Sequence, residues 1–114
     1  MPKEFSSSVK IFYPRYSRTE LVDLLRERLT RLPASVSLKH AVLFGSWANG
    51  KATAFSDIDV LVVYSDPPRE DAYRLLWHHL DLRGLELHVY SEQEAKEREQ
   101  TLNRMTQGGV VLFS

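Results

Sequence analysis

Two aspartates, Asp57 and Asp59, stand at the mouth of the apolar run 60–63 and are the residues of this chain best placed to do chemistry. In a β-strand, residues i and i+2 point to the same face and lie about 6.5–7 Å apart along the strand. Two carboxylates on one face repel each other unless a cation lies between them, and an acid inside an apolar strand is costly unless it is paired or metal-bound. The spacing therefore predicts that both aspartates bind one divalent cation, or two cations that share a ligand.

A tight turn, Gly45-Ser46, lies ten residues before Asp57 and directly follows the apolar run 41–44. A turn of this kind at the start of a helix can offer backbone N–H groups and a hydroxyl group to a phosphate. On its own, Gly45-Ser46 would more simply be a strand-to-helix turn with Ser46 as the N-cap. Together with the aspartate pair downstream, it predicts a combined site for a metal and a nucleotide.

The elements that must position these residues are predicted from apolar periodicity and from two capping-box patterns, Ser17–Glu20 and Ser91–Glu94. The predicted strands are 38–44, 57–64, 85–90 and 110–113, and the predicted helices are 18–32, 46–52, 69–82 and 92–106. Strands that alternate with helices imply an α/β fold, with a mixed β-sheet and helices packed on it. We expect a single domain over 1–114, with 1–16 as an N-terminal arm or a short edge strand.

Composition limits the classes of function. The chain has 114 residues and a formal net charge of zero, so a long nucleic acid is not expected as a stable partner. It has no cysteine, which excludes disulfides and thiolate metal sites. No apolar run approaches about 18 residues and the N-terminus does not resemble a signal peptide, so we expect no membrane partner and a cytoplasmic location.

The motif Gly-Ser, ten residues, Asp-x-Asp, followed by an acidic residue on a later strand, resembles the signature of the DNA polymerase β-like nucleotidyltransferase superfamily. The small size of the chain resembles the minimal nucleotidyltransferases of that superfamily, the MNT proteins. The resemblance covers 41–64 and extends more loosely to residue 90. It implies the nucleotidyltransferase fold, similar to the polymerase β palm, and the transfer of a nucleoside monophosphate, here AMP from ATP, to an acceptor hydroxyl.

The resemblance also implies roles for individual residues. Gly45 and Ser46 would hold the β- and γ-phosphates of the nucleotide. Asp57 and Asp59 would ligate two Mg²⁺ ions, and Glu86 would supply the third catalytic carboxylate, on the side of the acceptor.

Four further residues are expected near the nucleotide or the acceptor. Many relatives have a basic residue where this chain has Asn49, and Lys51 is the candidate to substitute for its charge. His88 shares a strand face with Glu86 and is a candidate substrate contact. Trp47 follows the turn directly, and its ring would stack on a base, line a partner surface, or pack in the core or at its rim.

Three functions are compatible with these residues. MNT proteins are commonly paired with a HEPN-domain ribonuclease, which implies an antitoxin that adenylylates its HEPN partner. A non-catalytic partner-binding subunit on the same fold is an alternative that Asn49 favours and the clustered carboxylates oppose. Nucleotidylation of a small molecule, such as an aminoglycoside, is the other alternative, and a homodimer is left open.

Overall fold

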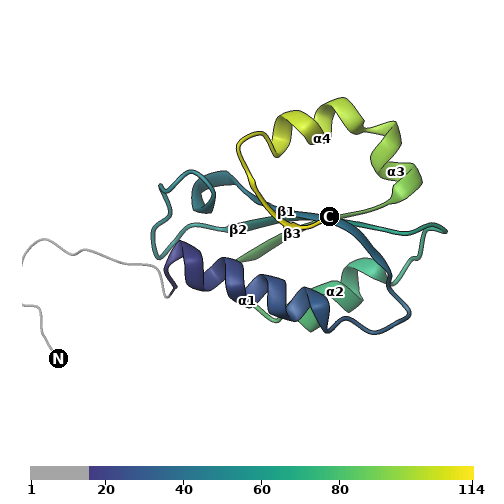
Figure 1. Cartoon of the computed structure of the whole chain (residues 1–114), viewed down its shortest axis with the longest axis horizontal. Helices are drawn as coiled ribbons and strands as arrows, with labels where there is room; N and C mark the ends of the chain where they lie inside the picture. Colours follow the sequence, from purple (N-terminus) through teal and green to yellow (C-terminus); the bar gives the residue numbers. More distant parts are fainter. Residues whose placement is uncertain (1–15) are drawn as a thin grey trace, which may run out of the picture.

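The computed structural model describes residues 16–114. The expected N-terminal arm therefore lies, except for Tyr16, outside the described residues. Four strands alternate with helices along the chain, as predicted (Figure 1). In chain order the elements are α1 (Arg18–Thr30), β1 (Leu38–Phe44), the 3₁₀ turn η1 (Gly45–Trp47), β2 (Ile58–Tyr64), α2 (Ala72–Leu80), β3 (Leu85–Ser91), α3 (Glu92–Glu97), α4 (Glu99–Met105) and β4 (Val110–Phe113).

The four strands form one mixed sheet in the order β3-β2-β1-β4. Strand β1 is antiparallel to both β2 and β4, whereas β3 runs parallel to β2. Parallel neighbours need a crossover connection, and α2 provides it. The predicted α/β class with a mixed sheet is therefore confirmed.

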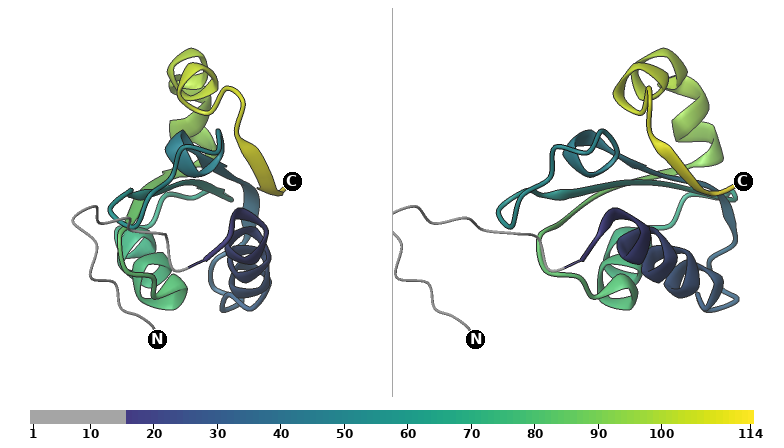
Figure 2. Two further views of the ribbon diagram at one scale, coloured as in Figure 1. Left: turned by 90° about the vertical axis from the view of Figure 1, so that its left-hand side faces the viewer. Right: turned by 60° about the vertical axis from the view of Figure 1, so that its left-hand side comes forward.

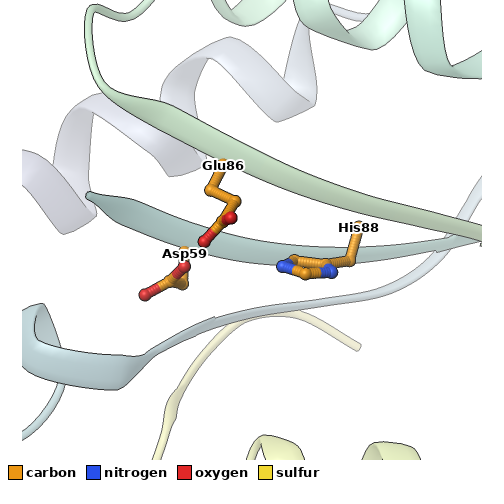
Figure 3. A group of neighbouring side chains, drawn as sticks. All are labelled: Asp59, Glu86 and His88. Atoms are coloured by element: carbon orange, nitrogen blue, oxygen red, sulfur yellow. The ribbon is translucent and has the colours of Figure 1, made fainter.

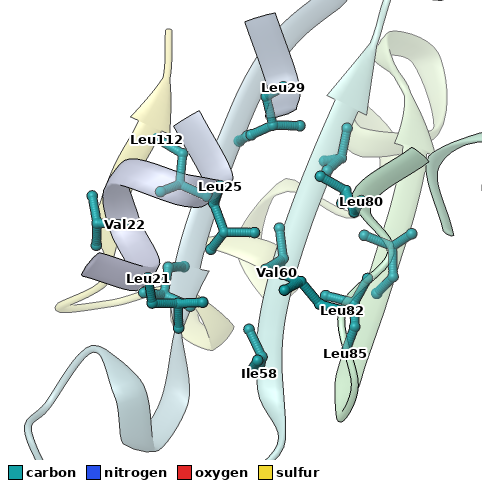
Figure 4. Packing of buried hydrophobic residues seen from close by; sticks show 14 of the residues in the cluster. Leu21, Val22, Leu25, Leu29, Ile58, Val60, Leu80, Leu82, Leu85 and Leu112 are labelled. Atoms are coloured by element: carbon teal, nitrogen blue, oxygen red, sulfur yellow. The ribbon is translucent and has the colours of Figure 1, made fainter. Parts of the chain in front are cut away.

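Helices α1 and α2 cover one face of the sheet, and α3 and α4 lie over the other face (Figure 2). Alternation along β2 explains both layers, because successive side chains point to opposite faces. Val60 packs with Leu25 of α1 and Leu80 of α2 in the larger core (Figure 4), while Leu61 packs with Leu102 of α4. Asp59 has the same orientation as Leu61, so it lies on the side of the sheet that carries α3 and α4.

Both predicted capping boxes are present. The backbone N–H of Glu20 donates to Ser17 Oγ at 3.1 Å, and that of Ser17 donates to Glu20 Oε1 at 2.8 Å. Ser91 and Glu94 make the same reciprocal pair at the start of α3. Each box satisfies N–H groups that have no partner inside their helix, which fixes where the helix begins.

The predicted helix over 46–52 is wrong beyond its first turn. Only Gly45–Trp47 is helical, and the chain then turns back through Gly50, whose φ is 79°. The backbone N–H of Lys51 closes this loop by donating to the carbonyl of Ser46 at 2.9 Å. A left-handed residue at position 50 cannot continue a right-handed helix, so the segment becomes a compact loop.

Helix α2 begins at Ala72 rather than at residue 69, because Arg69 is held by other partners. Its backbone N–H donates to the Tyr64 hydroxyl at 2.8 Å, and its guanidinium pairs with Asp71 at 2.9 Å. The predicted helix over 92–106 is likewise two helices, since Arg98 has φ −116° and ψ 23° and lies over the Tyr90 ring at 5.7 Å. Among residues 16–114, no helix combines the length and the apolarity needed to cross a bilayer.

Candidate active site

Asp59 and Glu86 are direct neighbours on adjacent parallel strands. The register of β2 and β3 pairs Asp59 with Glu86, although 26 positions of the sequence separate them. Figure 3 shows both carboxyl groups and the His88 ring on the same side of the sheet. One potential ligand atom from each of these three residues lies within 4.8 Å of the other two. The sheet therefore builds a three-residue cluster from two strands, and we call Asp59, Glu86 and His88 the acid–imidazole cluster.

Among residues 16–114, the carboxyl groups of the cluster have no lysine or arginine paired with them to neutralise their negative charge. The pKa of Asp59 is raised from 3.8 to about 7, first by burial, then by a hydrogen bond with Glu86 and by the charges of Glu86 and Asp57. Within the described part of the chain, no arginine or lysine forms an ion pair with Asp59 or Glu86. When Asp59 is protonated, its proton neutralises part of the negative charge of the cluster, which a bound cation would otherwise neutralise.

Gly45 is needed both for its backbone conformation and for the space that it leaves. Its φ is 77°, a left-handed conformation that side chains rarely adopt. A Cβ built on it would lie 2.4 Å from Oδ2 of Asp59, well inside the contact distance of real atoms. The predicted Gly-Ser turn and the predicted acid are thus in direct contact, which places the start of the turn beside the cluster.

The turn after β1 is held by its own backbone. The carbonyl of Gly45 accepts hydrogen bonds from the N–H groups of Ala48 at 3.0 Å and Asn49 at 3.2 Å. The first N–H groups of a helical turn have no partner inside it and are available to an anion. Asn49 Oδ1 accepts a hydrogen bond from the Lys51 N–H at 3.2 Å, so Asn49 stabilises the loop. Nucleotide contacts by Ser46, Asn49 and Lys51 stay predictions.

Asp57 lies just outside the acid–imidazole cluster. Strand β2 begins at Ile58, so the strand spacing that was to align Asp57 with Asp59 does not constrain Asp57. Its carboxylate is exposed and lines a surface pocket of about 400 Å³ together with Trp47 and Arg83. Its charge nevertheless reaches Asp59 and helps to raise the pKa of that group. Asp57 as a metal ligand stays a prediction.

The structure also shows where Trp47 and His88 lie, the two aromatic residues whose surroundings the sequence did not determine. Trp47 is only 4% exposed and belongs to the main core, and its indole Nε1 has no hydrogen-bond partner among the described residues. His88 is half-buried against Phe44, with ring centroids 5.4 Å apart. The sequence placed His88 on the face of Glu86 as a substrate contact, but not within ligand distance of Asp59. The proximity of His88 to Asp59 follows from the parallel register of β2 and β3, which sequence spacing does not specify.

The sequence matches the nucleotidyltransferase domain family over residues 22–108. That span contains the Gly-Ser turn, the aspartate pair and Glu86, and it covers most of the chain. The fold and the cluster of carboxylates beside the turn agree with this match. The chain therefore belongs to the nucleotidyltransferase domain family, which confirms the resemblance seen in its motifs.

Three individual proteins are similar to this chain to different extents. A protein of Methanocaldococcus jannaschii, provisionally named a protein adenylyltransferase, is 35% identical over 49 residues, which are 43% of this chain and half of that protein. A provisionally named nucleotidyltransferase of Sulfolobus solfataricus has a crystal structure that matches with a TM-score of 0.55 at 21% identity, over 83% of this chain and 81% of that one. A chain from a structure of the toxin–antitoxin pair MntA-HpeT matches with a TM-score of 0.48 at 21% identity, over 87% and 74%. The Sulfolobus structure shows that the fold is shared.

Proposed function

We propose that this nucleotidyltransferase transfers AMP from ATP to a hydroxyl group of a HEPN-domain protein and acts as its antitoxin. The observation that carries the proposal is the pairing of Asp59 with Glu86 beside the turn at Gly45. In the reaction, the acceptor oxygen forms a bond to the α-phosphorus. The bond from that phosphorus to the bridging oxygen breaks, pyrophosphate leaves, and the hydroxyl proton passes to a base.

The donor atoms of the site fit Mg²⁺, which prefers carboxylate oxygen and keeps several waters. Asp59 and Glu86 would hold one ion together, and Asp57 would contribute to a second. The raised pKa of Asp59 supports this assignment, because a cation would relieve the repulsion among these acids. When bound, two Mg²⁺ ions would activate the attacking hydroxyl and neutralise charge on the departing pyrophosphate.

The protein groups would mainly position the reactants, since phosphoryl transfer needs orientation and charge neutralisation more than covalent help. The N–H groups of the turn at 45–47 would bind oxygens of the β- and γ-phosphates. Lys51 would add positive charge to this region, in the place of the basic residue that many relatives have at position 49. Glu86 is exposed, so it would receive the proton of the incoming hydroxyl.

A protein acceptor is supported by one of the similar proteins. The Methanocaldococcus relative is itself named for transfer to protein. The MNT proteins that this sequence resembles are commonly paired with HEPN proteins, which makes such a protein the first acceptor to test.

The test is to incubate the chain with α-³²P-labelled ATP, Mg²⁺ and a HEPN-domain protein from the same organism. We expect label to enter the HEPN protein and its ribonuclease activity to fall in proportion. The Asp59→Asn variant should transfer no label. A wild-type chain that binds Mg²⁺ and ATP, yet leaves the HEPN protein unlabelled, would rule out this acceptor.

A non-catalytic antitoxin is the second candidate, and the observation in its favour is Asn49, which stabilises the loop where relatives place a cation. In that case the chain would neutralise its partner by contact alone. The double variant Asp57→Asn with Asp59→Asn separates the two functions. Full neutralisation of the HEPN protein by this variant supports the contact mechanism, and loss of neutralisation supports transfer.

A further inference from the structure

We propose that Asp59, Glu86 and His88 form a mixed oxygen–nitrogen site that binds a divalent transition-metal ion, with Mn²⁺ as the probe, more tightly than Mg²⁺. The inference rests on the proposed function, because it concerns the cation expected on the acceptor side of the same site. It adds a nitrogen ligand to a site for which only carboxylates were expected. It therefore predicts which metal the enzyme prefers.

The backbone fixes the relative positions of the three residues. Glu86 and His88 are two residues apart on β3 and share a face, and Asp59 lies opposite Glu86 in the register. Neither strand can shift by one residue without moving these side chains to the opposite face of the sheet. The imidazole is therefore a permanent neighbour of the two carboxyl groups (Figure 3).

The ring of His88 is also oriented by its packing. Phe44 is 8% exposed and lies opposite Asp59 on β1, and its ring meets the His88 ring at an interplanar angle of 52°. The imidazole thus extends from β3 across β2 toward Phe44, passing beside the Asp59 position. A ring held in this way loses little conformational freedom when it binds a metal.

The distances agree with shared coordination after small side-chain rotations. Ligand atoms about 2.0–2.2 Å from one ion lie within about 4.4 Å of each other. The potential ligand atoms of the acid–imidazole cluster already lie within 4.8 Å of one another. The remaining difference is a few tenths of an ångström at most, which small rotations of the side chains can close.

The ligand types decide the preference between metals. Mg²⁺ binds oxygen ligands almost exclusively, whereas Mn²⁺, Co²⁺ and Zn²⁺ also accept imidazole nitrogen together with carboxylate. Two carboxylates and one imidazole are such a mixed set. The opposing explanation is that His88 only packs on Phe44, in which case its nitrogen atoms have no influence on metal binding.

The experiment measures metal binding to the nucleotide-free chain by titration calorimetry, first with Mn²⁺ and then with Mg²⁺. We expect the wild type to bind Mn²⁺ at least about tenfold more tightly than Mg²⁺. His88→Phe keeps an aromatic ring against Phe44 but removes the nitrogen ligands. This variant should lose at least about tenfold in Mn²⁺ affinity, because loss of a residue that only hydrogen-bonds to a metal ligand already costs about 10–100-fold. Its Mg²⁺ affinity should stay within about twofold of the wild type.

A second readout tests the nitrogen ligand directly. Electron spin echo modulation of bound Mn²⁺ should show coupling to a ¹⁴N nucleus in the wild type and none in His88→Gln, which serves if His88→Phe folds poorly. His78→Phe is the matched control, because His78 is exposed on α2, over the opposite face of the sheet. Equal affinities for Mn²⁺ and Mg²⁺ in the wild type, or a ¹⁴N signal that persists in His88→Gln, would overturn the inference.

The two proposals fail in different ways. Tight Mn²⁺ binding through His88 without any AMP transfer would support the cation site and reject the proposed function. Transfer of AMP with a metal affinity that does not depend on His88 would support the function and reject the nitrogen ligand.

Discussion

Gly45 and Asp59 are in such close contact that no side chain fits between them: a Cβ on Gly45 would lie 2.4 Å from Asp59 Oδ2. Gly45 directly follows β1, and Asp59 is the second residue of the neighbouring strand β2, where it is paired in the register with Phe44. The turn expected to bind phosphate and the acid expected to bind metal are therefore built against each other. A change at one must alter the other.

Gly45→Ala should weaken divalent-metal binding and abolish nucleotide transfer, because the new methyl group displaces the Asp59 carboxylate. The left-handed backbone should add a stability cost of about 1–2 kcal/mol. Calorimetric titration of Mn²⁺ and Mg²⁺, together with urea unfolding, measures the two effects separately.

Gly50→Ala is the matched control for this substitution. Gly50 has φ 79°, almost the same as Gly45, but a Cβ there meets nothing within 4 Å. It should lose a similar amount of stability and retain metal binding. Equal loss of metal binding in both variants would mean that backbone strain, not the contact with Asp59, is responsible.

The raised pKa of Asp59 predicts how the stability of the metal-free protein depends on pH. Its pKa is about 7 in the folded chain against an ordinary value of 3.8, so the folded state holds the proton more tightly. The unfolded state then binds fewer protons between these values, and the free energy of unfolding falls as pH rises from about 4 to 7. Asp59→Asn removes this dependence and should be more stable than the wild type at pH 8.

The measurement is urea unfolding at pH 5 and pH 8 with a chelator present. Adding Mg²⁺ at pH 8 should stabilise the wild type and not Asp59→Asn, since binding needs the ionised carboxylate. Asp23→Asn, an exposed change on α1, should behave as the wild type does. An unchanged difference between wild type and Asp59→Asn at the two pH values would contradict the assignment.

Glu86→Gln should reduce the rate of nucleotide transfer by about 100-fold or more. The catalytic effect of a bound metal is worth several kcal/mol, and each ~1.4 kcal/mol is a factor of ten in rate. The variant keeps the size of the side chain, so its far-UV circular dichroism should match the wild type. Glu70→Gln, an exposed change before α2, is the control and should retain full activity.

Arg28 joins α1 to the end of α2, and its removal should destabilise the chain by about 1–3 kcal/mol, because two carbonyl groups there, one of them part-buried, lose a charged donor. Its guanidinium donates to the carbonyl oxygens of Leu80 and of Asp81, the latter at 2.9 Å, while its own carbonyl bonds to His79 Nε2 at 2.7 Å. Thermal unfolding of Arg28→Ala tests this contribution. Arg31→Ala should cost only a few tenths of a kcal/mol, since its pair with Glu27 is exposed.

The sequence predicted the elements whose signals are local and missed the interruptions whose causes are distant. The strand over 38–44 has the observed bounds, and the capping boxes fix the starts of α1 and α3. The late start of α2 depends on the Tyr64 hydroxyl, and the break at Arg98 accompanies its contact with the Tyr90 ring. No periodicity within those segments contains such information.

The candidate site likewise has parts that local sequence signals predict and parts that depend on distant contacts. The turn at Gly45 and the acids at 59 and 86 were recognisable from residue types and from the resemblance to a family. The contact of Asp59 with His88 was not, because it depends on the register between β2 and β3. Asp57 was expected to align with Asp59 as a strand neighbour, whereas β2 begins one residue later and leaves Asp57 exposed.

The parallel pairing of β2 with β3 has a consequence for synthesis of the protein. Asp59 is made well before Glu86, and the crossover helix α2 lies between them in the chain. A nascent chain that has only just exposed β2 outside the ribosome therefore has Asp59 but neither Glu86 nor His88. The proposed metal site is complete only when β3 has paired with β2.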